Sequence, residues 1–142
     1  MKKILLIVGA ALGVKWIYEH IMLADKLIFG IASMQASGSI LNPSLAIRLT
    51  AKNPTTYSAT ITNMVADIFL NGSIVKVADM VLTNPVTIQP GSTSDLHVNV
   101  KFLNNGIIDT IINLLSSNSG SKFYIKGWAT VDNIPLPLNL NY

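Results

Sequence analysis

The chain contains no cysteine and only two histidines among its 142 residues. The lack of cysteine excludes disulfides, thiolate zinc sites and thiol nucleophiles. His20 and His97 lie far apart in the chain, Glu19 is the only glutamate, and the aspartates are spread over separate segments. Catalysis and metal binding need ionisable groups that converge. The sequence therefore predicts no catalytic residue, no metal site, no cofactor and no enzymatic activity.

Charged residues are also scarce, at 12% of the chain, with a net charge of +3. The lysines and arginines do not cluster with aromatic residues, as they would on a nucleic-acid-binding face. The nine glycines form no phosphate-binding run. We therefore expect neither a nucleic-acid partner nor a small-molecule substrate. Apolar residues are abundant, at 50%, and the length fits one domain with a single core.

The first part of the chain is an apolar segment that follows two lysines. Residues 4–28 contain no proline, and Lys15, Glu19 and Lys26 recur near one face at helical spacing. This pattern predicts a continuous helix of about 25 residues. We expect its membrane or docking contacts to be made by these residues: Ile4, Leu5, Leu6, Ile7, Val8, Trp16 and Tyr18.

Several roles are open for this N-terminal hydrophobic helix, residues 1–28. Residues 4–18 would span about 22 Å as a helix, short of the ~30 Å hydrocarbon core of a bilayer. A membrane anchor is the favoured interpretation, and Lys2 and Lys3 then favour an extracytoplasmic location for the rest of the chain. The alternatives are a docking helix within a virion or other large particle, a secretory signal peptide, and a helix lying on a membrane surface.

Residues 45–77 predict two strands and a tight hairpin. Residues 45–52 alternate apolar and polar side chains, and Asn53-Pro54 ends this strand because proline cannot donate a ladder hydrogen bond. The next strand ends at Asn71-Gly72, which suits a two-residue type I′ turn. This turn places Phe69 opposite Ile74 and Asp67 opposite Lys76. We expect the exposed Phe69 and Ile74 pair to contact the N-terminal helix or a neighbouring strand, or to form a partner-binding patch.

The rest of the chain predicts further strands. Residues 31–40 could form a first strand, and residues 86–89 form a short one that ends at the turn dipeptide Pro90-Gly91. Residues 95–102 alternate strictly and predict one half-buried strand.

A change of period marks one short helix. Apolar residues in the segment 107–115 recur at helical spacing, with Asn104 or Asn105 as the candidate cap. After residues 123–131, Asp132-Asn133 turns the chain, and Pro135 and Pro137 confine the last strand to an edge. The predicted fold is mainly β: an antiparallel, immunoglobulin-like β-sandwich over residues 29–142, with one short helix and the N-terminal hydrophobic helix.

The order of these turns carries a family resemblance. The motifs are the strand 45–52 leading into Asn53-Pro54, the hairpin around Asn71-Gly72, the turn of residues 88–93, and Lys126-Gly127 followed by residues 134–137. Together they resemble the type-2 late embryogenesis abundant group and its water-stress and hypersensitive-response (WHy) domain, in bacterial or phage-encoded members. Thr55 departs from the pattern, since the family often has asparagine there. The resemblance implies a β-sandwich, often behind a hydrophobic segment, and a role in stress protection.

Three functions compete on this basis. The first is a non-enzymatic, membrane-tethered β-sandwich that acts through surface contacts as a stress-protective or holdase-like module. The second is a structural subunit of a larger assembly, such as a virion or envelope complex, docked through residues 1–28. The third is a binder of an apolar ligand between the sheets. The partners expected are accordingly a membrane, through the N-terminal helix, or other proteins of an assembly.

Overall fold

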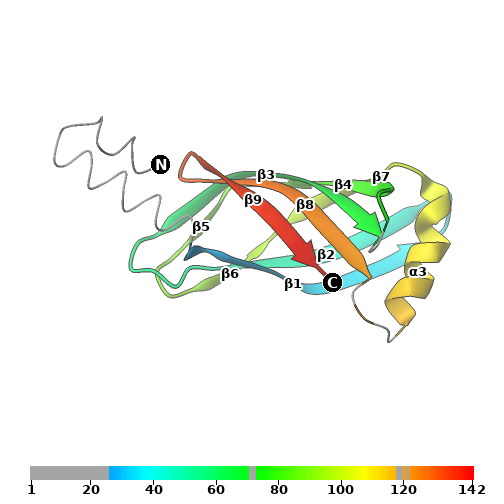
Figure 1. The fold of residues 1–142 in the computed structure, drawn as a ribbon, viewed down its shortest axis with the longest axis horizontal. Helices are drawn as coiled ribbons and strands as arrows, with labels where there is room; N and C mark the ends of the chain where they lie inside the picture. The colour runs from blue at the N-terminus through cyan, green and yellow to red at the C-terminus, as the bar shows by residue number, and fades with distance from the viewer. Residues whose placement is uncertain (1–25, 71–72, 118–119, 121) are drawn as a thin grey trace.

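The computed structural model describes residues 26–70, 73–117, 120 and 122–142. Two antiparallel sheets pack face to face (Figure 1). The first, sheet A, has the order β1-β2-β6: Ile28–Gly38, Pro43–Lys52 and Thr93–Leu96. The second, sheet B, has the order β7-β4-β3-β8-β9: Val98–Phe102, Lys76–Leu82, Ala59–Leu70, Phe123–Val131 and Ile134–Asn141. The short strand β5, Val86–Ile88, also pairs with β3. The predicted mainly-β antiparallel fold is confirmed.

The core lies between the two sheets and follows from alternation along the strands. In β2 every second side chain is buried, so this strand presents one apolar face inward and one polar face to solvent. Each leucine or isoleucine side chain that is fully buried in this way contributes about 1.5–3 kcal/mol to the stability of the fold. Both sheets and the helix supply fully buried side chains: Leu49, Ile61, Met64, Ile68, Met80, Ile88, Leu96, Ile108, Ile111, Phe123 and Ile125.

One helix covers an end of the sandwich (Figure 1). The 3₁₀ turn η1, Asn105–Ile107, leads into α3, Ile108–Ser116, and the side chain of Asn104 accepts a 2.9 Å hydrogen bond from the backbone N–H of Gly106. Ile108 and Ile111 are fully buried. The predicted helix is therefore confirmed, and the predicted cap Asn104 caps the 3₁₀ turn that leads into α3, because an asparagine in this position satisfies a free backbone donor.

The last hairpin forms as the sequence predicts. Asp132 and Asn133 have φ angles of 49° and 66°, and Val131 pairs directly with Ile134. Two successive left-handed residues are the mark of a type I′ turn. The strand β9 lies at the edge of sheet B, where Pro135 and Pro137 disturb no inner ladder.

The predicted register of the β3–β4 hairpin is wrong. Phe69 pairs with Lys76 and not with Ile74, and Asp67 pairs with Asp79. The backbone N–H of Val75 donates to Ser73 Oγ at 3.0 Å, and β4 begins only at Lys76. A local side-chain bond of this kind competes with ladder formation. The predicted turn residues Asn71 and Gly72 lie outside the described residues.

The predicted strand over residues 95–102 is two strands in different sheets. Leu96 ends β6 and belongs to sheet A, whereas Val98 begins β7 and pairs with Leu82 in sheet B. Between them, the backbone C=O of His97 accepts hydrogen bonds from Thr83 N–H at 3.0 Å and Thr83 Oγ1 at 2.9 Å. The alternation of apolar and polar residues continues from β6 into β7 because both strands face the same core. The sequence pattern therefore does not reveal that the chain passes from sheet A to sheet B at His97.

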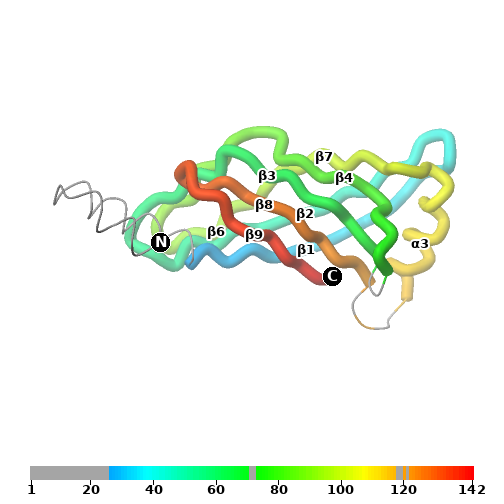
Figure 2. The backbone as a smooth tube through the Cα atoms, turned by 45° about the horizontal axis from the view of Figure 1, so that its top comes forward, coloured from blue at the N-terminus to red at the C-terminus, as the bar shows by residue number. Residues whose placement is uncertain are grey.

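The first strand begins at Ile28, inside the stretch assigned to the N-terminal helix. Residues 1–25, with the predicted contacts Ile4, Leu5, Leu6, Ile7, Val8, Trp16 and Tyr18, lie outside the described residues. In the described part of the chain, no helix has the length and apolar character needed to cross a membrane. Figure 2 shows β1 of sheet A running beside β9 of sheet B, with α3 at the end of the sandwich.

Candidate functional site

Among the described residues, Asn53 is the one polar residue that is fully buried. Its Nδ2 donates to the backbone C=O of Tyr57 at 2.6 Å and of Ile88 at 3.1 Å. Its Oδ1 accepts from the N–H of Thr55 at 3.1 Å and from Thr55 Oγ1 at 2.6 Å. Thr55, the departure from the family pattern, thus takes part in the same network. The side chain of Asn53 uses both its donors and both its acceptor sites.

The backbone of Asn53 joins a second turn to this network. Its N–H donates to the C=O of Ser92 at 2.9 Å, and its C=O accepts from the N–H of Gly91 at 2.8 Å. Gly91 has a φ of 70°, a conformation that glycine adopts without strain. The Asn53-Pro54 and Pro90-Gly91 turns therefore form one unit. Because its polar groups are already paired, this unit is built to hold the fold rather than to bind a ligand.

A small charge network lies on the outer face of sheet B. Lys76 Nζ contacts Asp67 Oδ1 at 2.8 Å and also contacts Asp79. The hydrogen bond that Lys76 donates to Asp67, followed by the one that it donates to Asp79, raises the pKa of Lys76. The predicted pairing of Asp67 with Lys76 thus forms despite the changed register. A lysine that is held protonated is not a general base, so this cluster is an ion-pair network.

Next to these charges an apolar row crosses the sheet. Val65 of β3 pairs with Val81 on one side and with Trp128 on the other, and Trp128 pairs with Pro137. The exposed fractions are 42% for Val81, 51% for Val65 and 59% for Trp128. Exposed apolar residues at paired positions of neighbouring strands, unlike scattered single ones, mark a surface for association. We call Val65, Val81, Trp128 and Pro137 the apolar row.

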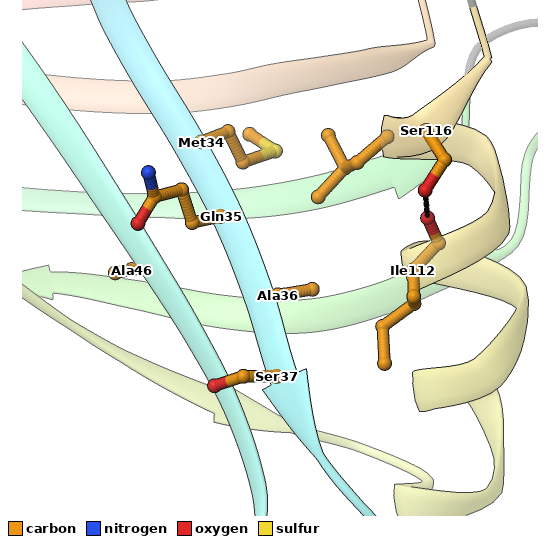
Figure 3. Close-up of a pocket in the computed structure, with 8 residues that line it drawn as sticks. Met34, Gln35, Ala36, Ser37, Ala46, Ile112 and Ser116 are labelled. Atoms are coloured by element: carbon orange, nitrogen blue, oxygen red, sulfur yellow. Dashed lines mark hydrogen bonds between the residues drawn. The ribbon is translucent and has the colours of Figure 1, made fainter.

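A groove of about 390 Å³ lies between the end of β1 and the helix α3 (Figure 3). The side chain of Ile112 projects from α3 toward β1, and Ser116 Oγ donates to the C=O of Ile112 at 2.9 Å. No ionisable side chain lines the groove. Its lining consists of Met34, Gln35, Ala36, Ser37, Ala46, Ile112, Leu115 and Ser116. The groove is therefore suited to uncharged groups.

The predicted contact pair Phe69 and Ile74 is separated in the structure. Phe69 is half-buried, and its ring centroid lies 6.3 Å from that of Tyr124. Ile74 is 96% exposed and lies in the connection between β3 and β4. The prediction that they face each other is wrong, because the connection is longer than two residues. In the described residues, no group of three or more histidine, aspartate or glutamate side chains could hold a metal ion.

Sequence reasoning missed both the apolar row and the groove. The signal for Trp128 was present, because the alternation that turns Phe123 and Ile125 inward also turns Trp128 outward. Nothing in the chain order shows that Trp128 lies beside Val65, since that contact depends on strand pairing. The groove likewise joins β1 and α3, which are far apart in sequence.

These features define an antiparallel β-sandwich with an exposed apolar row on sheet B, a groove between β1 and α3, and two turns that are joined by internal hydrogen bonds. Residues 48–141 match the LEA_2 family model, late embryogenesis abundant protein, and this match covers more than half of the chain. The chain therefore belongs to the type-2 late embryogenesis abundant family. A crystal structure of a protein from Archaeoglobus fulgidus is similar over 80% of this chain and 93% of that chain, with a TM-score of 0.47 and 18% identity. No curated protein sequence matches.

Proposed function

We propose that this protein is a non-enzymatic, WHy-type stress-protective module that binds partly unfolded proteins through apolar surface contacts. The observation that carries the proposal is the apolar row on a hydrogen-bonded sheet. Val65 and Trp128 are about half exposed, although inward positions of the same strands are fully buried. Membership of the late embryogenesis abundant family supports a protective role. Burial of this surface against a client would gain about 25 cal/mol per Å² of apolar area.

The row has a charged border that fits the same role. Two residues further along the strands, on the same face of the sheet, four charged residues pair in turn across four strands: Lys101, Asp79, Asp67 and Lys126. Both signs are interspersed, so the border favours neither acidic nor basic partners. Charged residues beside an apolar row permit contact with clients while they keep the protein soluble.

An aggregation assay tests this proposal. We expect the full chain, at equimolar amounts, to slow the light scattering of heated citrate synthase. Replacing the exposed residues of the row with polar ones, as Trp128→Ser and Val65→Thr, should remove most of the protection. The matched control is Leu103→Ser, since Leu103 is 54% exposed and lies outside the row. No protection by the full chain, or equal loss in the control, would contradict the proposal.

We further propose that residues 1–28 tether the sandwich to a membrane, on its extracytoplasmic side. The apolar run of residues 4–14 behind Lys2 and Lys3 supports this location. Alkaline carbonate washing and protease protection provide the test. Retention in the membrane pellet with a protected sandwich is the expected result. Recovery in a large particle without membrane would instead favour a docking helix and a structural role.

A further inference from the structure

The free edges of the two sheets differ in how well they are protected. The edge strand β9 carries Pro135 and Pro137, β6 has four residues and includes Asp95, and β7 carries Lys101. Prolines, charges and short strands are the devices by which proteins prevent an edge from pairing with another chain. Each of these three edges therefore discourages the addition of a strand.

The edge strand β1 carries no proline and no charged side chain, but a register shift between Ile31 and Ser33 interrupts its ladder with β2. It has eleven residues, IFGIASMQASG. An edge without prolines or charges offers a row of backbone N–H and C=O groups to an extended chain. Residues 33–38, which follow this register shift, pair regularly with β2 and contain neither proline nor a charged side chain, so strand addition is proposed for this part of β1.

The helix α3 gives the same edge a binding wall. Figure 3 shows β1 between β2 and α3, with Ile112 directed from the helix toward the strand. The groove volume of about 390 Å³ falls within the roughly 300–1,000 Å³ of ligand sites. Met34 and Ala36 contribute apolar atoms from the strand, and Leu115 does so from the helix. A strand edge beside a helix is the arrangement in which extended peptides are bound by backbone pairing, with side chains in pockets.

We propose that β1 binds an extended, uncharged polypeptide segment as an added strand, with its apolar side chains in the groove between β1 and α3. The lack of ionisable groups in the lining selects against charged side chains, because a buried charge without a partner is costly. The inference rests on the proposed function for its partner, a non-native protein whose segments are transiently extended. It adds a second site to the apolar row, with backbone pairing as the means of recognition.

Peptide binding by fluorescence anisotropy tests the site. The probe is a fluorescein-labelled peptide of alternating valine and threonine, titrated with the full chain in mild non-ionic detergent, with detergent alone as blank. We expect saturable binding that is lost when alternate peptide amides are N-methylated. Ser116→Trp, which fills the groove from the helix, should weaken binding about tenfold. Asn113→Trp, an exposed position of the same helix outside the lining, should bind as the unmodified chain does.

The outcomes separate this inference from the proposed function. Equal binding of the N-methylated probe would overturn it, since side-chain contacts alone would then explain the affinity. If Ser116→Trp binds the labelled peptide as tightly as the unmodified chain does, the proposed location of the site in the groove is wrong. A chain that pairs its β1 edge with a second copy, seen as a dimer in sedimentation with no peptide binding, would also overturn it.

If clients are protected from aggregation equally by Ser116→Trp and the unmodified chain, the proposed function stands without this site. Peptide binding without protection of the client would support the peptide site and contradict the proposed function.

Discussion

The two ends of the sandwich are held by different kinds of contact. Where β2 ends, Asn53 joins two turns through directional hydrogen bonds that use all its polar groups. At the other end, α3 packs on β1 and buries the side chain of Ile111 in the apolar core, and a groove remains between the helix and the strand. Directional, fully paired networks specify one conformation, whereas apolar contact tolerates varied shapes. The comparison assigns structural support to the Asn53 end and binding to the helix end.

The largest expected effect is at the Asn53 end. Asn53→Ala leaves the buried C=O of Ile88 and the N–H of Thr55 without their partners. We expect the free energy of unfolding to fall by about 3–5 kcal/mol, because each unpaired buried group costs about 1–3 kcal/mol. Urea unfolding followed by circular dichroism measures the change. Asn99→Ala, at an exposed position of β7, is the control. A fall in the free energy of unfolding of less than about 1 kcal/mol would contradict this prediction and would show that water replaces the hydrogen bonds of Asn53.

A smaller loss is expected at the helix end. Ile111→Ala creates a cavity under α3, where Ile111 is fully buried, and should cost about 2–4 kcal/mol. The same variant should weaken binding of the valine-threonine peptide, because α3 forms one wall of the groove. Asn113→Ala on the exposed side of the helix should change neither quantity. If Ile111→Ala loses stability but retains full peptide affinity, the assignment of binding to this end fails.

The smallest effect concerns Lys76, the first residue of β4, on the outer face of sheet B. Its pKa is raised above 10.5, first by the hydrogen bond that Lys76 donates to Asp67 and then by the one that it donates to Asp79. A raised pKa in the folded state gives stability that is complete below the unfolded pKa and lost as the pH rises through the folded value. The unmodified chain should therefore lose more stability above pH 10.5 than Lys76→Met does. Urea unfolding at neutral and alkaline pH provides the comparison, with Lys52→Met in sheet A as control. If the free energy of unfolding falls equally with pH in the unmodified chain, Lys76→Met and Lys52→Met, this prediction is wrong.

Local chemistry predicts much of this fold. The Asp132-Asn133 turn, the Asn104 cap and the edge position of Pro135 and Pro137 each depend on neighbouring residues, and each is confirmed. The β3–β4 register depends on more than the Asn71-Gly72 dipeptide. The observed register places Ala78 and Met80 in the core, while Val75, which the predicted register turns inward, is 61% exposed.

Features built from distant segments could not be predicted in the same way. The crossing at His97 leaves the apolar alternation intact, so only the pairing of Leu96 with Leu49 and of Val98 with Leu82 reveals it. The apolar row and the groove also exist only after the strands and α3 are assembled. Sequence periodicity shows which way a side chain faces, but it does not show which residues lie beside it.

Hydrogen exchange of the full chain, with and without heated citrate synthase, tests the central claim most directly. Backbone amides of residues 33–38 in β1 should exchange faster than those of residues 51–53, and the client should slow exchange in 33–38 while it leaves 51–53 unchanged. That result would place client binding at the edge beside α3. Client protection at the Asn53 end, or no change at β1, would contradict the division of the sandwich into a supporting end and a binding end.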